Sequence, residues 1–167
     1  MRIDNEDYFH GAALVQVARH NSCSGVVGVK PADGGVRGMF LVNTFTALCL
    51  RFARVPIRRS RSTYLFKFDE PALDALYRLT SEFPAVFLGF VCEPVGHICC
   101  LALDDFRKLH DLRQQAEGSR QGQCFDLLVD ATRRKQFHVY VRHPRKRKTR
   151  LDQVIVPRDA FPGRIFA

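Results

Sequence analysis

Hydrophobic and polar positions along the first half of this chain predict one helix and four strands. Residues 6–19 repeat their apolar side chains at helical spacing and follow a capping Asp4 or Asn5. Segments rich in β-forming residues come next, and the alternating TYLFKF predicts the fourth strand. The expected strands are residues 25–30, 38–43, 46–53 and 63–68.

The second half of the chain predicts two more helices and several strands, one of which is deeply buried. Glu70 and Pro71 open a helix to about residue 82. The nearly all-apolar AVFLGFVC, residues 85–92, predicts a strand that is covered on both faces. Further along, the pattern predicts a strand at 97–101, a helix at 103–115, a hairpin of 124–129 with 137–142, and a short strand at 153–156. Helices flanking a mixed sheet define an α/β fold, a three-layer α/β/α sandwich.

Length and composition fit a single domain. The chain has 167 residues, of which 46% are hydrophobic, enough for a sizeable core. Within residues 1–167 we expect a core at about 5–115 and a basic, β-rich C-terminal extension at about 123–167. No apolar run reaches the roughly 20 residues of a membrane helix, and the polar start MRIDNEDYFHG is unlike a secretory signal. We therefore expect a cytoplasmic protein without a membrane partner.

Positive charge is segregated along the sequence. The net charge of +9 arises entirely in residues 131–167, which hold 11 Lys and Arg against only Asp152 and Asp159. Residues 1–130 balance 15 basic against 15 acidic side chains, yet 51–61 contain five arginines and no acid. Segregated charge of this kind indicates a polyanionic partner.

The charge pattern therefore predicts contacts with the phosphate backbone of DNA or RNA, which require positive charge and no particular base sequence. A solubilising tail is the alternative interpretation of the same pattern. The expected nucleic-acid contacts are Arg51, Arg54, Arg58, Arg59, Arg61, Arg133, Arg134, Lys135, Arg142, Arg145, Lys146, Arg147, Lys148 and Arg150.

Strand motifs in the first two thirds of the chain resemble a known nuclease fold. The pair FLVN and LCLRFAR, followed by STYLFKF, VFLGFVC and HICCLALDDF, resembles the restriction-endonuclease-like PD-(D/E)xK superfamily over about residues 5–105. In active members, as this resemblance implies, an acid on the second strand and an acid and a Lys on the third serve Mg²⁺-dependent cleavage. The matching positions here hold Asn43, Cys49 and Arg51. An amide and a thiol do not replace two carboxylates, so the resemblance implies a degenerate site without a metal cofactor.

Three functions stay open at this stage. The first is a catalytically inactive nucleic-acid-binding subunit; its setting in a bacterial defence or mobile-element system is implied by the resemblance alone. The second is an active Mg²⁺-dependent endonuclease whose acids have moved to Asp33 or Asp69. The third is a protein-interaction module whose basic segments dock an acidic partner.

The cysteines and histidines offer weaker candidates. Cys92, His97, Cys99 and Cys100 lack the spacing of a zinc site, and neighbouring residues of a strand point to opposite faces. We expect reduced core cysteines and no zinc, Cys49 included.

The histidine and aromatic candidates are also explained by ordinary structural roles. His10 is expected to be structural or on the surface, and His138 and His143 lie among arginines. Aromatic side chains on strands would stack on bases if exposed, although alternation favours the core. These residues are Tyr64, Phe66, Phe68, Phe137 and Tyr140.

Overall fold

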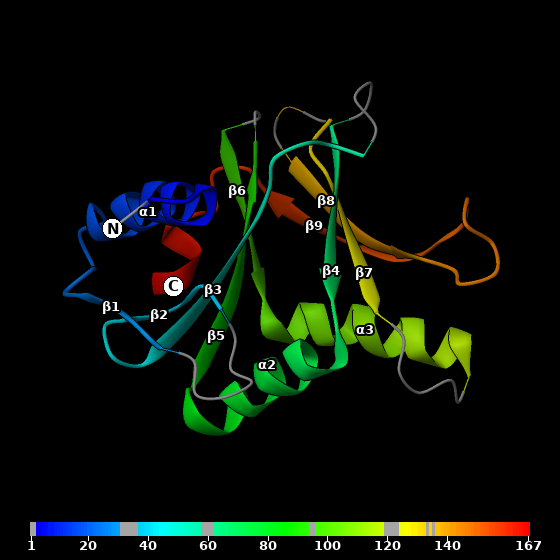
Figure 1. The fold of residues 1–167 in the computed structure, drawn as a ribbon, viewed down its shortest axis with the longest axis horizontal. Coiled ribbons are helices and arrows are strands. Elements are labelled where there is room, and N and C mark those ends of the chain that lie inside the picture. Colours follow the sequence, from blue (N-terminus) through cyan, green and yellow to red (C-terminus); the bar gives the residue numbers. More distant parts are fainter. Residues whose placement is uncertain are drawn as a thin grey trace.

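The computed structural model describes residues 3–30, 37–57, 62–93, 96–118, 124–132, 134 and 136–167. It has the α/β composition that the hydrophobic pattern predicts, with helices and two β-sheets (Figure 1). The elements are α1 (Asn5–Ala18), β1 (Val26–Gly28), β2 (Met39–Val42), β3 (Thr46–Ala53), β4 (Thr63–Phe68), α2 (Glu70–Glu82), β5 (Ala85–Cys92), β6 (His97–Ala102), α3 (Leu103–Glu117), β7 (Phe125–Asp130), β8 (Gln136–Arg142), β9 (Arg150–Pro157) and the 3-10 helix η2 (Gly163–Phe166).

Local signals place the first two helices where the sequence predicts them. Asp4 caps α1 in a capping box, in which its side chain and that of Asp7 each accept a hydrogen bond from the other residue's backbone N–H. Asp69 caps α2 by accepting a hydrogen bond from the backbone N–H of Ala72, and Pro71 occupies the first turn.

The first sheet is mixed and has the strand order β1-β2-β3-β5-β6. β1, β2 and β3 are antiparallel neighbours, β5 runs parallel to β3, and β6 is antiparallel to β5. A parallel neighbour requires a crossover connection, and here the crossover contains β4 and α2.

The second sheet is antiparallel throughout and has the order β4-β7-β8-β9. β4 therefore leaves the mixed sheet and pairs with β7, so a strand from the middle of the chain joins the three strands of the expected C-terminal extension. The hairpin expected from residues 124–142 is present as the antiparallel pair β7–β8.

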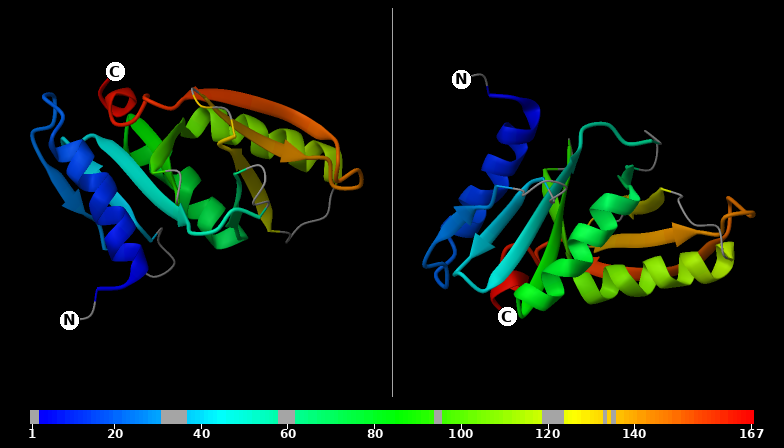
Figure 2. Two further views of the ribbon diagram at one scale, coloured as in Figure 1. Left: turned by 90° about the horizontal axis from the view of Figure 1, so that it is seen from above. Right: turned by 60° about the horizontal axis from the view of Figure 1, so that its bottom comes forward.

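Two apolar clusters lie on opposite faces of the mixed sheet. The smaller one joins the sheet to α1 and the C-terminal segment through residues such as Val17, Leu48 and Ile165. The larger one joins the other face to α2, α3 and the second sheet (Figure 2). The layer opposite α1 is thus built of helices and a sheet together, whereas the sequence predicted helices alone.

Four of the six cysteines are buried core residues, and all six are free thiols. Cys99 belongs to the larger apolar cluster and Cys100 to the smaller one, so the two side chains point to opposite faces of β6 as the strand period predicts. Burial raises the pKa of the Cys49, Cys92 and Cys100 thiols to about 12, which keeps them protonated and unreactive at neutral pH.

The helices are short relative to a lipid bilayer. Within the described ranges, none of them has the length and apolarity that a membrane crossing requires.

Candidate nucleic-acid interface

Asn43, which matches the metal-binding acid of the nuclease resemblance, lies in the turn between β2 and β3 with a φ of 53°. Its Oδ1 accepts hydrogen bonds from the backbone N–H of Ser24 at 2.7 Å and from the Ser24 hydroxyl at 2.9 Å. Its Nδ2 donates to the carbonyl oxygen of Ser22 at 2.7 Å. The amide therefore ties this turn to the segment that follows α1.

Cys49 and Arg51 lie on β3, away from that turn. Val42 pairs with Thr46 at the turn, and Arg51 is five residues farther along β3, which corresponds to roughly 16 Å. The residue opposite Cys49 on β2 is Met39. The guanidinium of Arg51 instead lies 5.1 Å from the ring centroid of Phe68. The structure does not bring Asn43 together with the other two positions.

The carboxylates proposed as displaced ligands do not complete a metal site among the described residues. Asp33 lies outside the described residues. Oδ1 of Asp69 accepts from the backbone N–H of Ala72 at 2.9 Å, which is the capping bond of α2. No group of three or more His, Cys, Asp or Glu side chains suited to a metal occurs in the part of the chain that the structure describes. A buried thiol of raised pKa, a methionine and an engaged amide do not fit Mg²⁺, which prefers hard oxygen ligands.

The outward face of the second sheet has a different character. Along β4, the side chains of Tyr64, Phe66 and Phe68 enter the larger core, so Leu65 and Lys67 lie on the opposite face. The same alternation turns other side chains outward on β7 and β8. These are Asp126, Leu128, Asp130, His138, Tyr140 and Arg142.

Two adjoining clefts lie on this outward face. The larger has a volume of about 390 Å³, and the smaller has a volume of about 270 Å³. Arg142 and Arg147 line both clefts, so the two form one continuous surface, which we call the basic cleft. Its lining residues are Ile57, Thr63, Leu65, Arg113, Asp126, Leu128, Asp130, Tyr140, Arg142, His143, Pro144, Arg147, Lys148 and Arg150.

Two arginines of the basic cleft are engaged by protein groups. Arg150 lies 3.6 Å from a carboxylate oxygen of Asp130, and its guanidinium lies over the ring of Tyr140 at 3.9 Å from the centroid. Arg113 of α3 lies 2.7 Å from a carboxylate oxygen of Glu117. These ion pairs reduce the positive charge that either arginine presents to a ligand.

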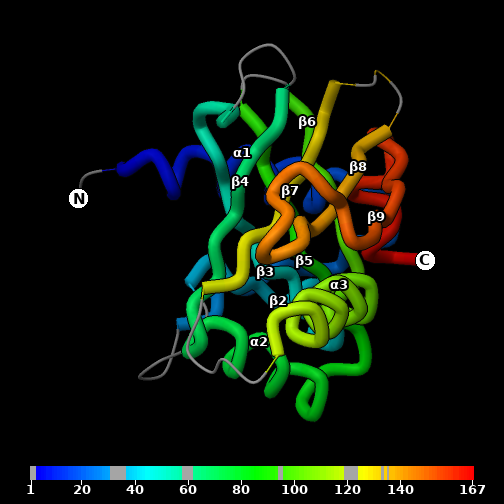
Figure 3. Tube along the Cα trace, turned by 90° about the vertical axis from the view of Figure 1, so that its right-hand side faces the viewer, coloured from blue at the N-terminus to red at the C-terminus, as the bar shows by residue number. Residues whose placement is uncertain are grey.

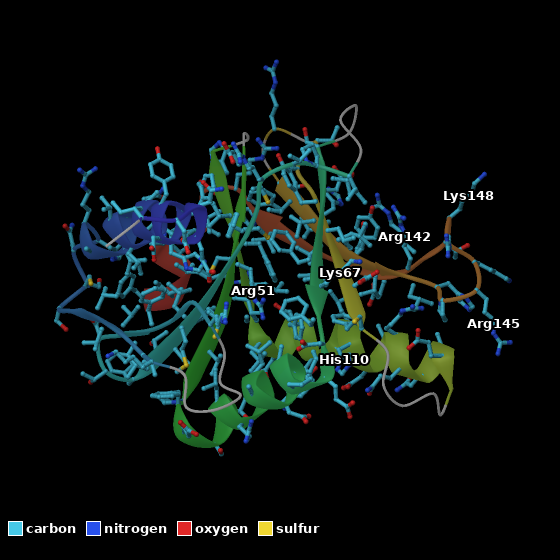
Figure 4. The ribbon with its side chains drawn as sticks, in the orientation of Figure 1. Arg51, Lys67, His110, Arg142, Arg145 and Lys148 are labelled. Atoms are coloured by element: carbon cyan, nitrogen blue, oxygen red, sulfur yellow. The ribbon has the colours of Figure 1, made fainter. Side chains whose placement is uncertain are left out.

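The remaining cations of the basic cleft and of the adjoining turn between β8 and β9 have no ion-pair partner among the described residues. Arg142 ends β8, and the four that follow are exposed on the turn between β8 and β9. Figure 3 views the molecule from the side of this turn, and Figure 4 shows where three of the cations lie. The five are Arg142, Arg145, Lys146, Arg147 and Lys148.

The turn that carries these cations is held in one shape by its own hydrogen bonds. Nδ1 of His143 accepts from the backbone N–H groups of Arg145 at 3.1 Å and Lys146 at 3.3 Å. The backbone N–H of His143 donates to Thr149, and that of Thr149 donates to Lys146. A preorganised turn loses less conformational entropy when a ligand binds.

The other sequence-predicted contacts lie elsewhere or outside the described residues. Arg51 lies on β3 of the mixed sheet, apart from the turn cations in Figure 4, and Arg54 lies 3.9 Å from Glu93. Arg134 is exposed between β7 and β8. Arg58, Arg59, Arg61, Arg133 and Lys135 lie outside the described residues. The structure thus gathers the cations of 142–150, while the arginines of 51–61 are not shown to join them.

Sequence reasoning did not identify Arg113, Asp126 or Asp130 as parts of this surface. Asp126 and Asp130 alternate with Leu128 on FDLLVD, a pattern that indicates one polar face of a strand. That signal was present, whereas Arg113 joins from a helix distant in sequence, which only the tertiary structure reveals.

The predicted histidine and aromatic candidates are largely part of the core. His10 is 6% exposed, and its ring packs edge-on against Phe40 and Phe52, so burial lowers the pKa of His10. His138 is also buried.

A buried histidine that the sequence analysis did not consider joins α3 to α2. Nδ1 of His110 lies 2.5 Å from the hydroxyl of Tyr77, and burial lowers the pKa of His110. Burial also raises the pKa of the Tyr77 hydroxyl. Figure 4 shows His110 away from the turn between β8 and β9, so we assign this pair to packing between the helices.

Comparison of the chain with family models, curated proteins and solved structures found no match. The structure by itself defines an α/β protein in which a mixed sheet packs against a second, antiparallel sheet. The second sheet carries a cleft lined by Arg142, Arg147 and Lys148, which have no acidic partner among the described residues.

Proposed function

We propose that this protein binds nucleic acid through the phosphate backbone, at the basic cleft and the adjoining turn. The observation that carries the proposal is the shared position of Arg142 and Arg147 on both clefts, next to the exposed run from Arg145 to Lys148. Arginine presents several N–H donors in a planar fork that matches two phosphate oxygens. Charge of this kind favours the backbone over any particular base sequence.

The positions of the two acids in the basic cleft indicate which of its cations contact phosphates. Asp130 accepts hydrogen bonds from Thr132 and lies beside Arg150, so its charge is largely compensated. Asp126 lines the larger cleft, where it would repel a phosphate bound close to it. Phosphates are therefore assigned to Arg142, Arg147 and the turn.

In this proposal, the mixed sheet derives from a nuclease fold that has lost its catalytic residues. The order α1, β1–β3, α2 and β5 is compatible with that resemblance. The residues at the metal positions do not fit Mg²⁺, as described above. The protein would then act as an inactive binding subunit, and a bacterial defence or mobile-element setting rests on the resemblance alone.

Affinity for nucleic acid should fall steeply with salt. If five cations each contact one phosphate, a plot of log K against log salt should have a slope of about −4 to −5 on a duplex. Fluorescence anisotropy with a labelled duplex, measured between about 50 and about 200 mM NaCl, checks this slope. Polyglutamate serves as the control polyanion. Binding to polyglutamate in preference to nucleic acid would replace this proposal with an acidic protein partner. The absence of binding to both duplexes and single strands would do the same.

The purified protein should not cleave DNA or RNA when Mg²⁺ or Mn²⁺ is added. Neither Asn43 nor Cys49 supplies the oxygen ligands on which such cleavage depends. Incubation of labelled duplexes and single strands with each metal, resolved on denaturing gels, measures this. Cleavage that is lost in Asp33→Ala or Asp69→Ala would instead show that the protein is a nuclease with displaced acids.

A further inference from the structure

We propose that the nucleic acid bound here is duplex DNA, and that the hairpin of β8 and β9 enters its major groove. This inference rests on the proposed function and adds the class of nucleic acid and the groove. It is carried by three features: the position of the hairpin, the burial of the aromatic side chains around it, and the arrangement of its cations.

The turn between β8 and β9 lies at one end of the molecule. In Figure 1 it is at the opposite end of the long axis from α1 and both chain termini, and Figure 2 agrees. β8 and β9 are paired from Gln136 with Pro157 to Arg142 with Arg150, whereas the pairing of β7 with β8 reaches only Tyr140, so the turn is presented on a short two-stranded ribbon at the edge of the second sheet. The C-terminal end of α3 lies beside this ribbon, and its Arg113 lines the larger cleft, so the part that enters a groove is the turn with the ribbon residues next to it (Figure 2).

Groove dimensions favour B-form DNA. Two paired strands lie about 4.8 Å apart, and the B-form major groove, about 12 Å wide, admits a two-stranded β-ribbon. The major groove of an RNA duplex is deep and narrow, and side chains do not enter it. A ribbon that carries its charge at the tip therefore suits duplex DNA better than duplex RNA.

The cations are arranged at two levels along this ribbon. Arg145 to Lys148 are exposed at the turn, and Arg142 lies at the base of the turn, where it lines both clefts. When the turn occupies the groove, the cations of the turn face the phosphates along its walls. Arg142 then faces the backbone that borders the groove.

Single strands are disfavoured because the second sheet offers no stacking surface. Proteins that bind single strands commonly stack bases on exposed aromatic rings. Every aromatic side chain of β4, β7 and β8 is at least nine-tenths buried, and Arg150 covers the ring of Tyr140. In the described part of the chain, the large exposed aromatic side chains are Tyr8 and Phe45, which belong to α1 and the β2–β3 turn.

Competition among matched probes tests the inference with the whole protein. A DNA duplex, an RNA duplex and a DNA single strand of one length and sequence compete for binding at one salt concentration. The affinity for the DNA duplex should exceed that for either competitor by about tenfold or more. Neither competitor offers both paired phosphate walls and an open major groove.

Blocking one groove at a time locates the hairpin. A DNA duplex with glucosylated 5-hydroxymethylcytosine, which fills the major groove, should bind about tenfold or more weaker than the unmodified duplex. Netropsin, which occupies the minor groove, should leave the affinity unchanged. Equal binding of the glucosylated duplex, or tighter binding of the single strand or RNA duplex, overturns this inference while the proposed function stands. Absence of salt-dependent binding to every probe overturns both.

Discussion

Replacing Arg145, Lys146, Arg147 and Lys148 together with alanine should lower the affinity for nucleic acid on the order of 10³-fold at low salt. Each exposed cation that contacts a phosphate contributes roughly 1 kcal/mol, so four contacts amount to about 4 kcal/mol. The dependence of log K on log salt should become less steep by about 3 to 4, since each lost phosphate contact releases one counterion fewer. Fluorescence anisotropy titrations at several salt concentrations measure both quantities.

A matched control separates a local contact from the overall charge of the protein. Arg19, Lys30, Arg37 and Arg78 are exposed and lie outside the second sheet, so their joint replacement with alanine removes the same four charges. We expect this control to keep most of the affinity and nearly the full salt slope. Equal losses in both variants would mean that binding depends on net charge alone, without a specific site at the turn.

Circular dichroism and thermal unfolding test whether the turn variant loses binding merely because it unfolds. The side chains of Arg145, Lys146, Arg147 and Lys148 are exposed, and none has an ion-pair partner among the described residues. Exposed substitutions of this type usually change stability by less than about 0.5 kcal/mol each. An unchanged melting temperature with lost binding therefore assigns the effect to recognition.

Phe90→Ala should destabilise the whole protein by about 3–5 kcal/mol, a large share of the stability of an ordinary domain. Phe90 of β5 is 0% exposed, and its ring centroid lies 4.6 Å from that of Phe66 and 6.4 Å from that of Phe68. The ring thus fills the space between the mixed sheet and β4 of the second sheet. Its removal leaves a cavity that neither rigid sheet closes easily.

Chemical denaturation followed by circular dichroism measures this loss. Because the larger apolar cluster contains residues of both sheets, we expect one cooperative transition in the wild type and in the variant. Phe45→Ala is the matched control: Phe45 is 54% exposed in the β2–β3 turn, and its loss should change stability by less than about 1 kcal/mol. Two separate transitions, or a small effect of Phe90→Ala, would mean that the second sheet folds as an independent extension.

Much of the local structure was predictable because it depends on short-range physics. The period of apolar residues, the capping residue Asp4 and the Glu70–Pro71 pair correctly located α1 and α2. The uninterrupted apolar run of β5 correctly indicated a strand that is covered on both faces. The opposite orientations of Cys99 and Cys100 likewise follow from the two-residue period of a strand.

The candidate site was predictable only in part. The concentration of Lys and Arg between residues 133 and 150 identified the basic segment, because charge composition is a property of the sequence alone. Which arginines are compensated was not predictable. Arg150 and Asp130 are 20 positions apart in the sequence, and they become neighbours only when β7, β8 and β9 pair.

Sheet membership was decided by the tertiary structure. Alternation along TYLFKF indicates that Tyr64, Phe66 and Phe68 share one face, but every strand offers the same backbone hydrogen-bonding groups to any neighbour. The choice of β7 as the partner of β4 depends on burying that aromatic face against Phe90 and Phe106. The same non-local packing separates Asn43 from Arg51.

The sequence by itself thus determined the elements, the faces of each strand and the location of the positive charge. Only the tertiary structure decided that β4 joins the C-terminal strands and that Arg142 and Arg147 share one cleft. The reason is physical: periodicity and charge act within a few residues, whereas strand pairing and cleft formation depend on contacts between segments that the chain brings together from a distance.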